Sequence, residues 1–181
     1  MIMFMVEVVG GLKADSASLL ADAADFFGDA ANYALSLFAL ALAPVWRSRS
    51  ALVKGLTMGG FGIFALGKAA WNAAAETLPE PATMGVIGFL ALLTNLAVAG
   101  LLFAYRNGDA DMRSVWLCSR NDAIGNVAVM LAALGVYGTG AGWPDIVVAA
   151  IMGVLALTAA RTVIVHARGE LNTKRLVTEK T

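Results

Sequence analysis

An otherwise apolar stretch, residues 19–43, contains three aspartates: Asp22, Asp25 and Asp29. Residues three and four positions apart share one face of a helix, so the three carboxylates would form a single stripe. A charged side chain at the centre of a bilayer costs about 2.5–3.5 kcal/mol on insertion scales, so the stripe needs a cation, protons or water. Protonation or hydration near the surface is the simpler interpretation. For Asp22, about two turns after the expected N-cap Ser16, surface hydration is as well supported as a buried role.

A second polar stripe lies in the stretch 114–138. Cys118, Asp122 and Asn126 recur every four residues and would also share one helical face. Two carboxylates from the first stripe, with the thiolate and carboxylate of the second, would supply four ligands, the number that a tetrahedral Zn²⁺ or Cd²⁺ site uses. The predicted ligands are Asp25, Asp29, Cys118 and Asp122. Cys118 is equally consistent with a small apolar side chain in a helix interface, so both interpretations stay open.

The composition places these stripes in a membrane protein. Hydrophobic residues make up 59% of the 181 residues and charged residues only 14%, with a mean hydropathy of +0.74, whereas a soluble domain is about half apolar and a quarter charged. The 13 basic and 13 acidic residues balance, which argues against a nucleic-acid partner. A single cysteine excludes an internal disulfide.

Apolar runs separated by polar, proline or glycine-rich joints predict an all-α, polytopic membrane helical bundle. Each run reaches the roughly 20 residues that cross the hydrocarbon core. The five predicted full transmembrane helices are about 16–43, 52–75, 84–105, 114–138 and 144–166. The stretch 1–12 would span only about 18 Å, so we interpret it as part of a further helix. We expect a single transmembrane domain over 1–181, with no soluble domain.

Basic residues gather in alternate joints, which predicts the orientation of the bundle. They follow the first, third and last full helices: Arg47, Arg49, Lys54, Arg106, Arg113, Arg168, Lys174, Arg175 and Lys180. The opposite joints hold Lys13 as their only basic residue and are mildly acidic. The positive-inside rule therefore predicts a cytoplasmic C-terminus.

Both stripes and their surroundings resemble the cation diffusion facilitator family, proton-coupled exporters of divalent metals. "VEVVGGLKADSASLLADAADFFGDA" is similar to the end of the family's first helix, its outer loop and its second helix, where a His or Asp precedes an Asp by four positions. Here those positions are Asp25 and Asp29. "CSRNDAIGNVAVMLAALGVYGTGAGWPDIVVAAIMGVL" is similar to helices 5 and 6, where the same pattern ends at Asp122.

The resemblance implies a six-helix fold and exchange of a divalent metal (Zn²⁺, Cd²⁺ or Co²⁺) for protons. It implies a homodimer in a bacterial inner membrane, with the lipid bilayer, the metal and protons as partners, and no prosthetic group. The sequence departs from the family at Cys118, where His or Asp is usual, and in the joint "RNGDADMR", which lacks histidine. It also ends at Thr181, soon after the last helix, so we expect no cytoplasmic C-terminal domain, and we interpret the first helix as incomplete.

Other polar residues inside the apolar runs have two interpretations. They line a transport pathway, or they form hydrogen bonds between helices; these residues are Glu7, Asn32, Asn95 and Asn126. Lys68 and Arg120 are expected to pair with a carboxylate or to extend toward the membrane surface. His166 is expected to lie on the surface.

Three other functions remain open. A proton-coupled carrier of a non-metal substrate would also use intramembrane aspartates, but would gain nothing from paired ligands one turn apart on two helices. A non-transporting assembly protein would explain the small-residue faces, for example Gly55 and Gly153, without needing buried carboxylates. A metal-dependent membrane enzyme lacks an accompanying histidine motif or nucleophile.

Overall fold

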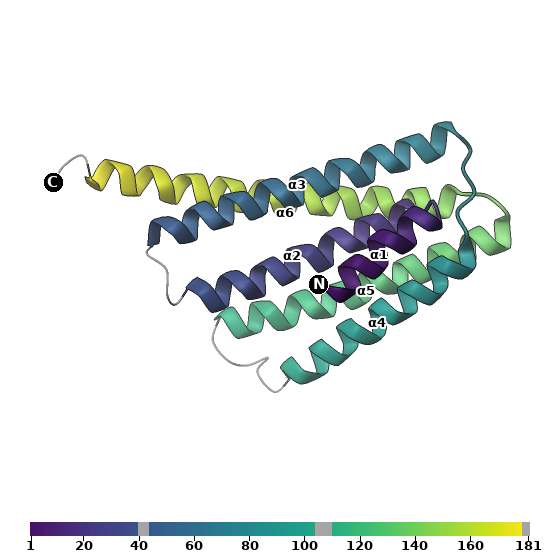
Figure 1. Cartoon of the computed structure of the whole chain (residues 1–181), viewed down its shortest axis with the longest axis horizontal. Helices are drawn as coiled ribbons and strands as arrows, with labels where there is room; N and C mark the ends of the chain where they lie inside the picture. The colour runs from purple at the N-terminus through teal and green to yellow at the C-terminus, as the bar shows by residue number, and fades with distance from the viewer. Residues whose placement is uncertain (40–43, 104–109, 179–181) are drawn as a thin grey trace.

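The computed structural model describes residues 1–39, 44–103 and 110–178, and most of these residues are helical (Figure 1). Side chains within these ranges are described except those of residues 32–33, 35–39, 44–47, 50, 110–119 and 172–178. The helices are α1 (Ile2–Lys13), α2 (Ala17–Ala39), α3 (Pro44–Ala74), α4 (Pro81–Leu102), α5 (Ala110–Thr139) and α6 (Trp143–Thr178). The predicted all-α bundle is confirmed.

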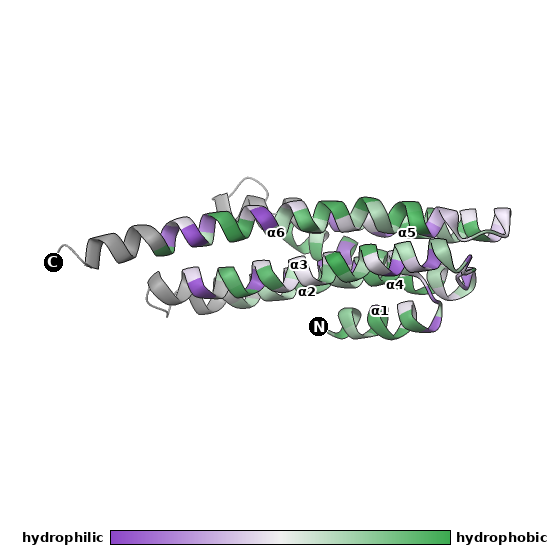
Figure 2. Ribbon diagram, turned by 90° about the horizontal axis from the view of Figure 1, so that it is seen from above, coloured by the Kyte–Doolittle hydropathy of each residue, from purple (hydrophilic) through white to green (hydrophobic). Residues whose placement is uncertain are grey.

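Within the described residues, three stretches are long and apolar enough to cross a membrane: Pro81–Leu102, Arg120–Thr139 and Trp143–Leu171. They belong to α4, α5 and α6. Figure 2 shows apolar residues along much of these helices, with polar residues gathered toward the ends of the bundle. The five full transmembrane helices expected from the sequence therefore stay a prediction for α2 and α3.

Four helices extend by three or more residues beyond a predicted boundary. α3 begins at Pro44 instead of residue 52, α4 at Pro81 instead of 84 and α5 at Ala110 instead of 114, and α6 continues to Thr178 instead of ending at 166. Proline is favoured at the first helical position, where its missing N–H has no partner to lose. The prediction stopped where the apolar run stopped, but arginine, lysine and glutamate continue a helix well outside an apolar environment.

α2 lies at the centre of the bundle and contacts each of the other helices. α3 packs along α6 more extensively than any other pair, and α4 packs along α5 (Figure 1). The α3–α6 contact depends on small residues: a Cβ on Gly55 would lie 2.7 Å from Ile164 Cγ1, and one on Gly153 would lie 2.8 Å from Leu66 Cγ. Glycine therefore allows these two helices to approach closely.

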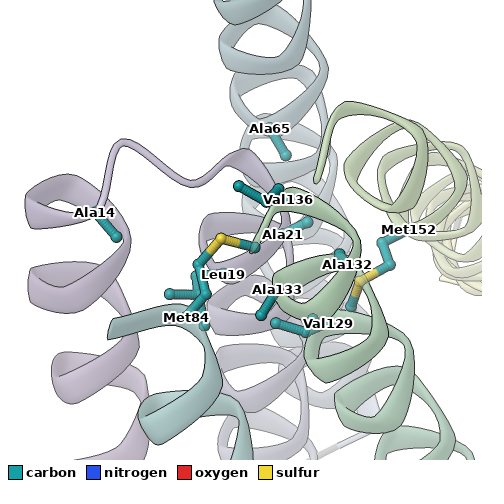
Figure 3. Packing of buried hydrophobic residues seen from close by; sticks show 10 residues of the cluster. All are labelled: Ala14, Leu19, Ala21, Ala65, Met84, Val129, Ala132, Ala133, Val136 and Met152. Atoms are coloured by element: carbon teal, nitrogen blue, oxygen red, sulfur yellow. The ribbon is translucent and has the colours of Figure 1, made fainter. Parts of the chain in front are cut away.

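Small side chains also dominate the buried apolar core between the helices (Figure 3). Its members are Ala14, Leu19, Ala21, Ala65, Met84, Val129, Ala132, Ala133, Val136 and Met152. Five of these ten residues are alanines, which allow close helix packing where water does not drive association. This core lies beside the first turns of α2 and therefore positions the aspartate stripe that follows.

The start of α2 is held by a polar group that we call the Asp145 cluster, formed by Asp145, Ser16 and Ser18. Asp145, in the first turn of α6, accepts hydrogen bonds from Ser16 Oγ at 2.7 Å and from Ser18 Oγ at 2.6 Å. Its carboxylate also accepts from the backbone N–H groups of Ala17 at 2.8 Å and Ser18 at 3.0 Å. A carboxylate at a helix N-terminus satisfies unpaired N–H groups and the helix dipole.

Ser16 confirms the predicted N-cap, because its Oγ accepts a hydrogen bond from the backbone N–H of Leu19 at 3.2 Å. The preceding residue, Asp15, has a φ of 52°. Its carbonyl accepts from Asn72 Nδ2 at 2.7 Å and its carboxylate pairs with Lys68 Nζ at 2.7 Å. The predicted pairing of Lys68 with a carboxylate is confirmed, and the turn between α1 and α2 is tied to α3.

Candidate metal site

The aspartates of α2 extend from the centre of the bundle toward α5. Asp22 is 1% exposed, whereas Asp25 and Asp29 are partly buried. The carboxyl groups of Asp29 and Asp122 lie within hydrogen-bonding range of each other, so one can donate to the other when it carries a proton. Asp25 is close enough to interact electrostatically with both Asp29 and Asp122. The structure thus brings together the carboxylates of the two predicted stripes.

The thiol of Cys118 lies outside the described side chains, although the backbone of α5 places residue 118 one turn before Asp122. Among the described side chains, no three of His, Cys, Asp or Glu are arranged closely enough to hold a metal ion. The carboxyl groups of Asp29 and Asp122 are within hydrogen-bonding range of each other. Asp25 interacts with Asp29 electrostatically but does not complete a three-ligand metal site among the described side chains. The four-ligand set stays a prediction.

Asp22 is buried, which corrects the interpretation that it stays hydrated near the membrane surface. Its Oδ2 accepts a hydrogen bond from Asn126 Nδ2 at 2.6 Å. Asn126 Oδ1 in turn accepts from Asn95 Nδ2 at 2.9 Å. All three side chains are at most 5% exposed. α2, α5 and α4 are therefore joined by a continuous chain of polar groups, as the inter-helix interpretation of Asn95 and Asn126 predicts; the side chain of Asn32 is outside those described.

Glu7 lies against Asp22 from α1. It is 0% exposed, and its carboxyl group is within hydrogen-bonding range of that of Asp22. Apart from Asp22, no described residue donates to either Glu7 oxygen. From the sequence, Glu7 is only one of several polar residues in apolar runs. Its position as the lone acid between Met1 and Leu12 was the available signal, but its partner was not predictable from spacing.

Lys54 corrects a second expectation. It was expected among the basic residues that follow the first full helix, but its side chain, within α3, is only 8% exposed. Its ammonium group interacts electrostatically with Asp29. A lysine that faces the carboxylates from α3 offsets part of their negative charge.

Asp29 also borders an open cavity of about 480 Å³ between α1, α2 and α4. Thr94 and Asn95 of α4 line the same cavity. The rest of the wall is apolar, so Asp29, Thr94 and Asn95 are the polar groups that line this cavity. The other candidate polar residues lie outside this region: His166 is exposed, as expected, and its Nδ1 contacts the carbonyl of Thr162 at 3.0 Å.

The sequence profile of the cation efflux transmembrane domain matches residues 1–171. The chain belongs to the cation efflux family. This family, which comprises transporters and not enzymes, is the one that the paired motifs resemble, and membership makes the chain a multi-pass membrane protein.

Two curated cation efflux proteins are similar over most of the chain. They are the metal cation efflux system protein CzcD of Cupriavidus metallidurans and the cation efflux system protein CzcD of an Alcaligenes species. Each is 27% identical over 165 residues, which cover 84% of this chain and 52% of the relative. The chain therefore spans about half the length of the curated relatives it matches.

Proposed function

We propose that this chain exports a divalent metal cation of the Zn²⁺, Cd²⁺ and Co²⁺ class, in exchange for protons, through a site between α2 and α5. The observation that carries the proposal is the meeting of Asp29 and Asp122 inside a cation efflux domain. Two carboxyl groups within hydrogen-bonding range of each other, on neighbouring helices, need a shared proton or a cation between them. A divalent metal satisfies the same requirement.

The proposed ligands are Asp25, Asp29, Cys118 and Asp122. Metal binds the deprotonated carboxylates and thiolate, so protons compete with it for the same groups. On the side of lower pH the ligands take up protons and release the metal, and on the other side they lose protons and bind it. The thiolate favours Zn²⁺ and Cd²⁺ over Mg²⁺ and Mn²⁺, which prefer oxygen ligands.

We further propose that the site opens toward the end of α2 that lies away from the Asp145 cluster. Asp145 holds the first turn of α2 with four hydrogen bonds, and the Lys68–Asp15 pair ties the adjoining turn to α3. A helix held at one end moves most at the other. Lys54 lies toward that free end and interacts electrostatically with Asp29. Its ammonium group would offset the charge of Asp29 when no metal is bound, and the metal would take over this role on binding.

The setting of the protein completes the proposal. The basic joints predict a cytoplasmic C-terminus. The resemblance to the cation diffusion facilitator family implies a homodimer in a bacterial inner membrane. In this interpretation α2 and α3 also cross the bilayer, although α2 carries three aspartates and was not among the apolar spans. The charge of the three aspartates is neutralised by metal or protons in the bundle interior.

The test is metal flux into proteoliposomes that contain the purified chain, with and without a pH gradient. We expect Cd²⁺ or Zn²⁺ uptake that a gradient of the correct sign accelerates. Asp25→Asn should remove this flux, whereas Glu76→Gln, a matched change at an exposed turn residue, should leave it intact. A proton-coupled carrier of a non-metal substrate would instead show proton movement that added metal leaves unchanged.

A further inference from the structure

Glu7 of α1 and Asp22 of α2 form a pair of carboxyl groups in the bundle interior. They are 0% and 1% exposed and lie within hydrogen-bonding range of each other. Asn126 donates to Asp22 Oδ2, but neither oxygen of Glu7, nor Asp22 Oδ1, accepts a hydrogen bond from any further described residue. Buried carboxyl oxygens without a donor are costly, so this pair needs a ligand that supplies positive charge or a hydrogen.

Two carboxylates in contact inside a medium of low dielectric constant are not both ionised, because their repulsion adds to the cost of burial. One proton shared between them removes both problems: the protonated carboxyl donates to the ionised one. The hydrogen bond from Asn126 then stabilises the remaining negative charge on Asp22.

A proton fits this pair better than a metal ion does. The side-chain amides of Asn126 and Asn95 extend the hydrogen-bonded chain from Asp22. Asp25 interacts electrostatically with both acids, but no third carboxylate, histidine or thiol is close enough to complete a metal site among the described side chains. Both acids are enclosed by protein. A divalent cation would have to lose its water there with too few ligands to replace it, whereas a proton needs one acceptor.

We propose that Glu7 and Asp22 form a proton-binding site, separate from the predicted metal ligands, whose proton is released when metal binds between α2 and α5. The first part stands on the geometry of the pair. The second part, the release, rests on the proposed function. One of the exchanged protons would then be bound by Glu7 and Asp22, and not by the metal ligands.

The two sites are linked through the helices they share. Asp22 precedes Asp25 by three residues on α2, and Asn126, which donates to Asp22, follows Asp122 by four residues on α5. A divalent cation at the ligands favours ionisation of the nearby pair, since opposite charges attract. The protonated carboxyl then becomes a carboxylate, its proton passes to water, and the new negative charge lies near Asp25, one of the proposed ligands.

Other charged groups surround the pair. Asp25 of α2 and Asp122 of α5 interact electrostatically with the pair. Lys54 of α3 interacts with Asp29, and α4 contributes only the neutral Asn95 among the described side chains. From α6, the nearest described acid is Asp145, which is already paired with Ser16 and Ser18. The negative surroundings favour retention of the proton until a cation arrives.

Infrared spectroscopy of the purified full chain in lipid tests the site, because a protonated carboxyl has its own carbonyl stretching band. In Glu7→Gln, the amide N–H replaces the acid O–H as donor to Asp22, so the hydrogen bond is kept and the ionisable proton of the acid is lost. We expect the carboxylic-acid band of the wild type to lose intensity in Glu7→Gln and to be unchanged in Glu76→Gln. A band of equal intensity in wild type and Glu7→Gln overturns the proposal.

Asp22→Asn is the second variant, used if Glu7→Gln fails to fold by circular dichroism and gel filtration. Its amide donates to Glu7, so the same loss of the band is expected, and an unchanged band overturns the site. The release is tested by adding Cd²⁺ to the wild type while its binding is measured by equilibrium dialysis. Because the metal ligands also lose protons when Cd²⁺ binds, the same titration is carried out on the folded variant. A larger loss of the band in the wild type than in the variant supports release from the pair, and an equal loss in both overturns it.

Failure of the proposed function has a different signature. If Cd²⁺ does not bind the wild type at all, metal exchange fails with the proposed function. The comparison of wild type with Glu7→Gln needs no metal, so it still decides whether the pair holds a proton.

Discussion

The carboxylates of this protein divide into two regions with opposite hydrogen-bonding patterns. In the Asp145 cluster, one carboxylate accepts four hydrogen bonds from Ser16, Ala17 and Ser18, all of which belong to the protein. In the bundle interior, Glu7 has no donor apart from its neighbouring acid among the described residues, and Asp29 meets another acid, Asp122. Asp145 has fixed hydrogen-bond donors within the protein, whereas the interior acids need a proton or a metal ion that binds and dissociates.

This contrast separates structure from transport. A carboxylate with fixed donors is stabilised in its charged form and adds to the stability of the fold. A buried carboxylate that faces another acid is costly until a proton or metal arrives, so its cost is tied to ligand binding. Substitutions in the two regions should therefore have different effects.

The largest effect is expected in the interior. Asp29→Asn and Asp122→Asn should each reduce metal flux and cadmium protection of cells by about 100-fold or more, because even indirect partners of a metal ion contribute 10–100-fold. Stability should be retained or increased, since an amide avoids the cost of a buried charge. Metal uptake in proteoliposomes and thermal unfolding measure the two effects. Full protection by both variants would contradict the metal-site interpretation.

The Asp145 cluster should respond in the opposite way. Asp145→Ala removes four hydrogen bonds to the first turn of α2 and should lower the free energy of unfolding by about 2–4 kcal/mol. Ser18→Ala, the matched smaller change, should cost about 1 kcal/mol. Denaturant unfolding in detergent measures both. If the folded Asp145→Ala protein lost Cd²⁺ affinity without losing stability, the division between the two regions would be wrong.

An intermediate effect on selectivity is expected at residue 118. Cys118→Asp should weaken transport of Cd²⁺ relative to Mn²⁺ by about tenfold, because a hard oxygen ligand replaces a soft sulfur ligand. Competition between the two metals in the same proteoliposomes measures the ratio. An unchanged ratio would mean that Cys118 contributes packing and is not a ligand.

The smallest effect is expected at the exposed ion pair next to the Asp145 cluster. Asp15→Asn breaks the contact with Lys68, but Asp15 is 57% exposed, and exposed ion pairs contribute about 0–1 kcal/mol. Asparagine also accepts the positive φ of this position. Unfolding and metal flux should both stay close to wild type. A loss of several kcal/mol would show that this pair belongs with the Asp145 cluster energetically.

Local features of the chain were predictable from the sequence. The helical spacing of the α2 and α5 stripes, the N-cap at Ser16 and the all-helical class all follow from residues close together in the chain. Helix ends were less predictable: α3 starts at Pro44 because backbone hydrogen bonding continues beyond the apolar run. Lys54 was expected with the basic residues of a joint, although it falls inside the predicted helix 52–75, and the structure buries it.

The sequence by itself determined which residues share a helical face, because 3.6 residues per turn sets their spacing without reference to any other helix. It therefore identified both carboxylate stripes and the family motifs they carry. Only the tertiary structure decided which acids meet. Asp145 caps a helix that begins 128 residues earlier, and Glu7 lies against Asp22 instead of water. Such pairings depend on how α1, α2 and α6 pack together, and packing is set by the shapes of all their contacting surfaces at once.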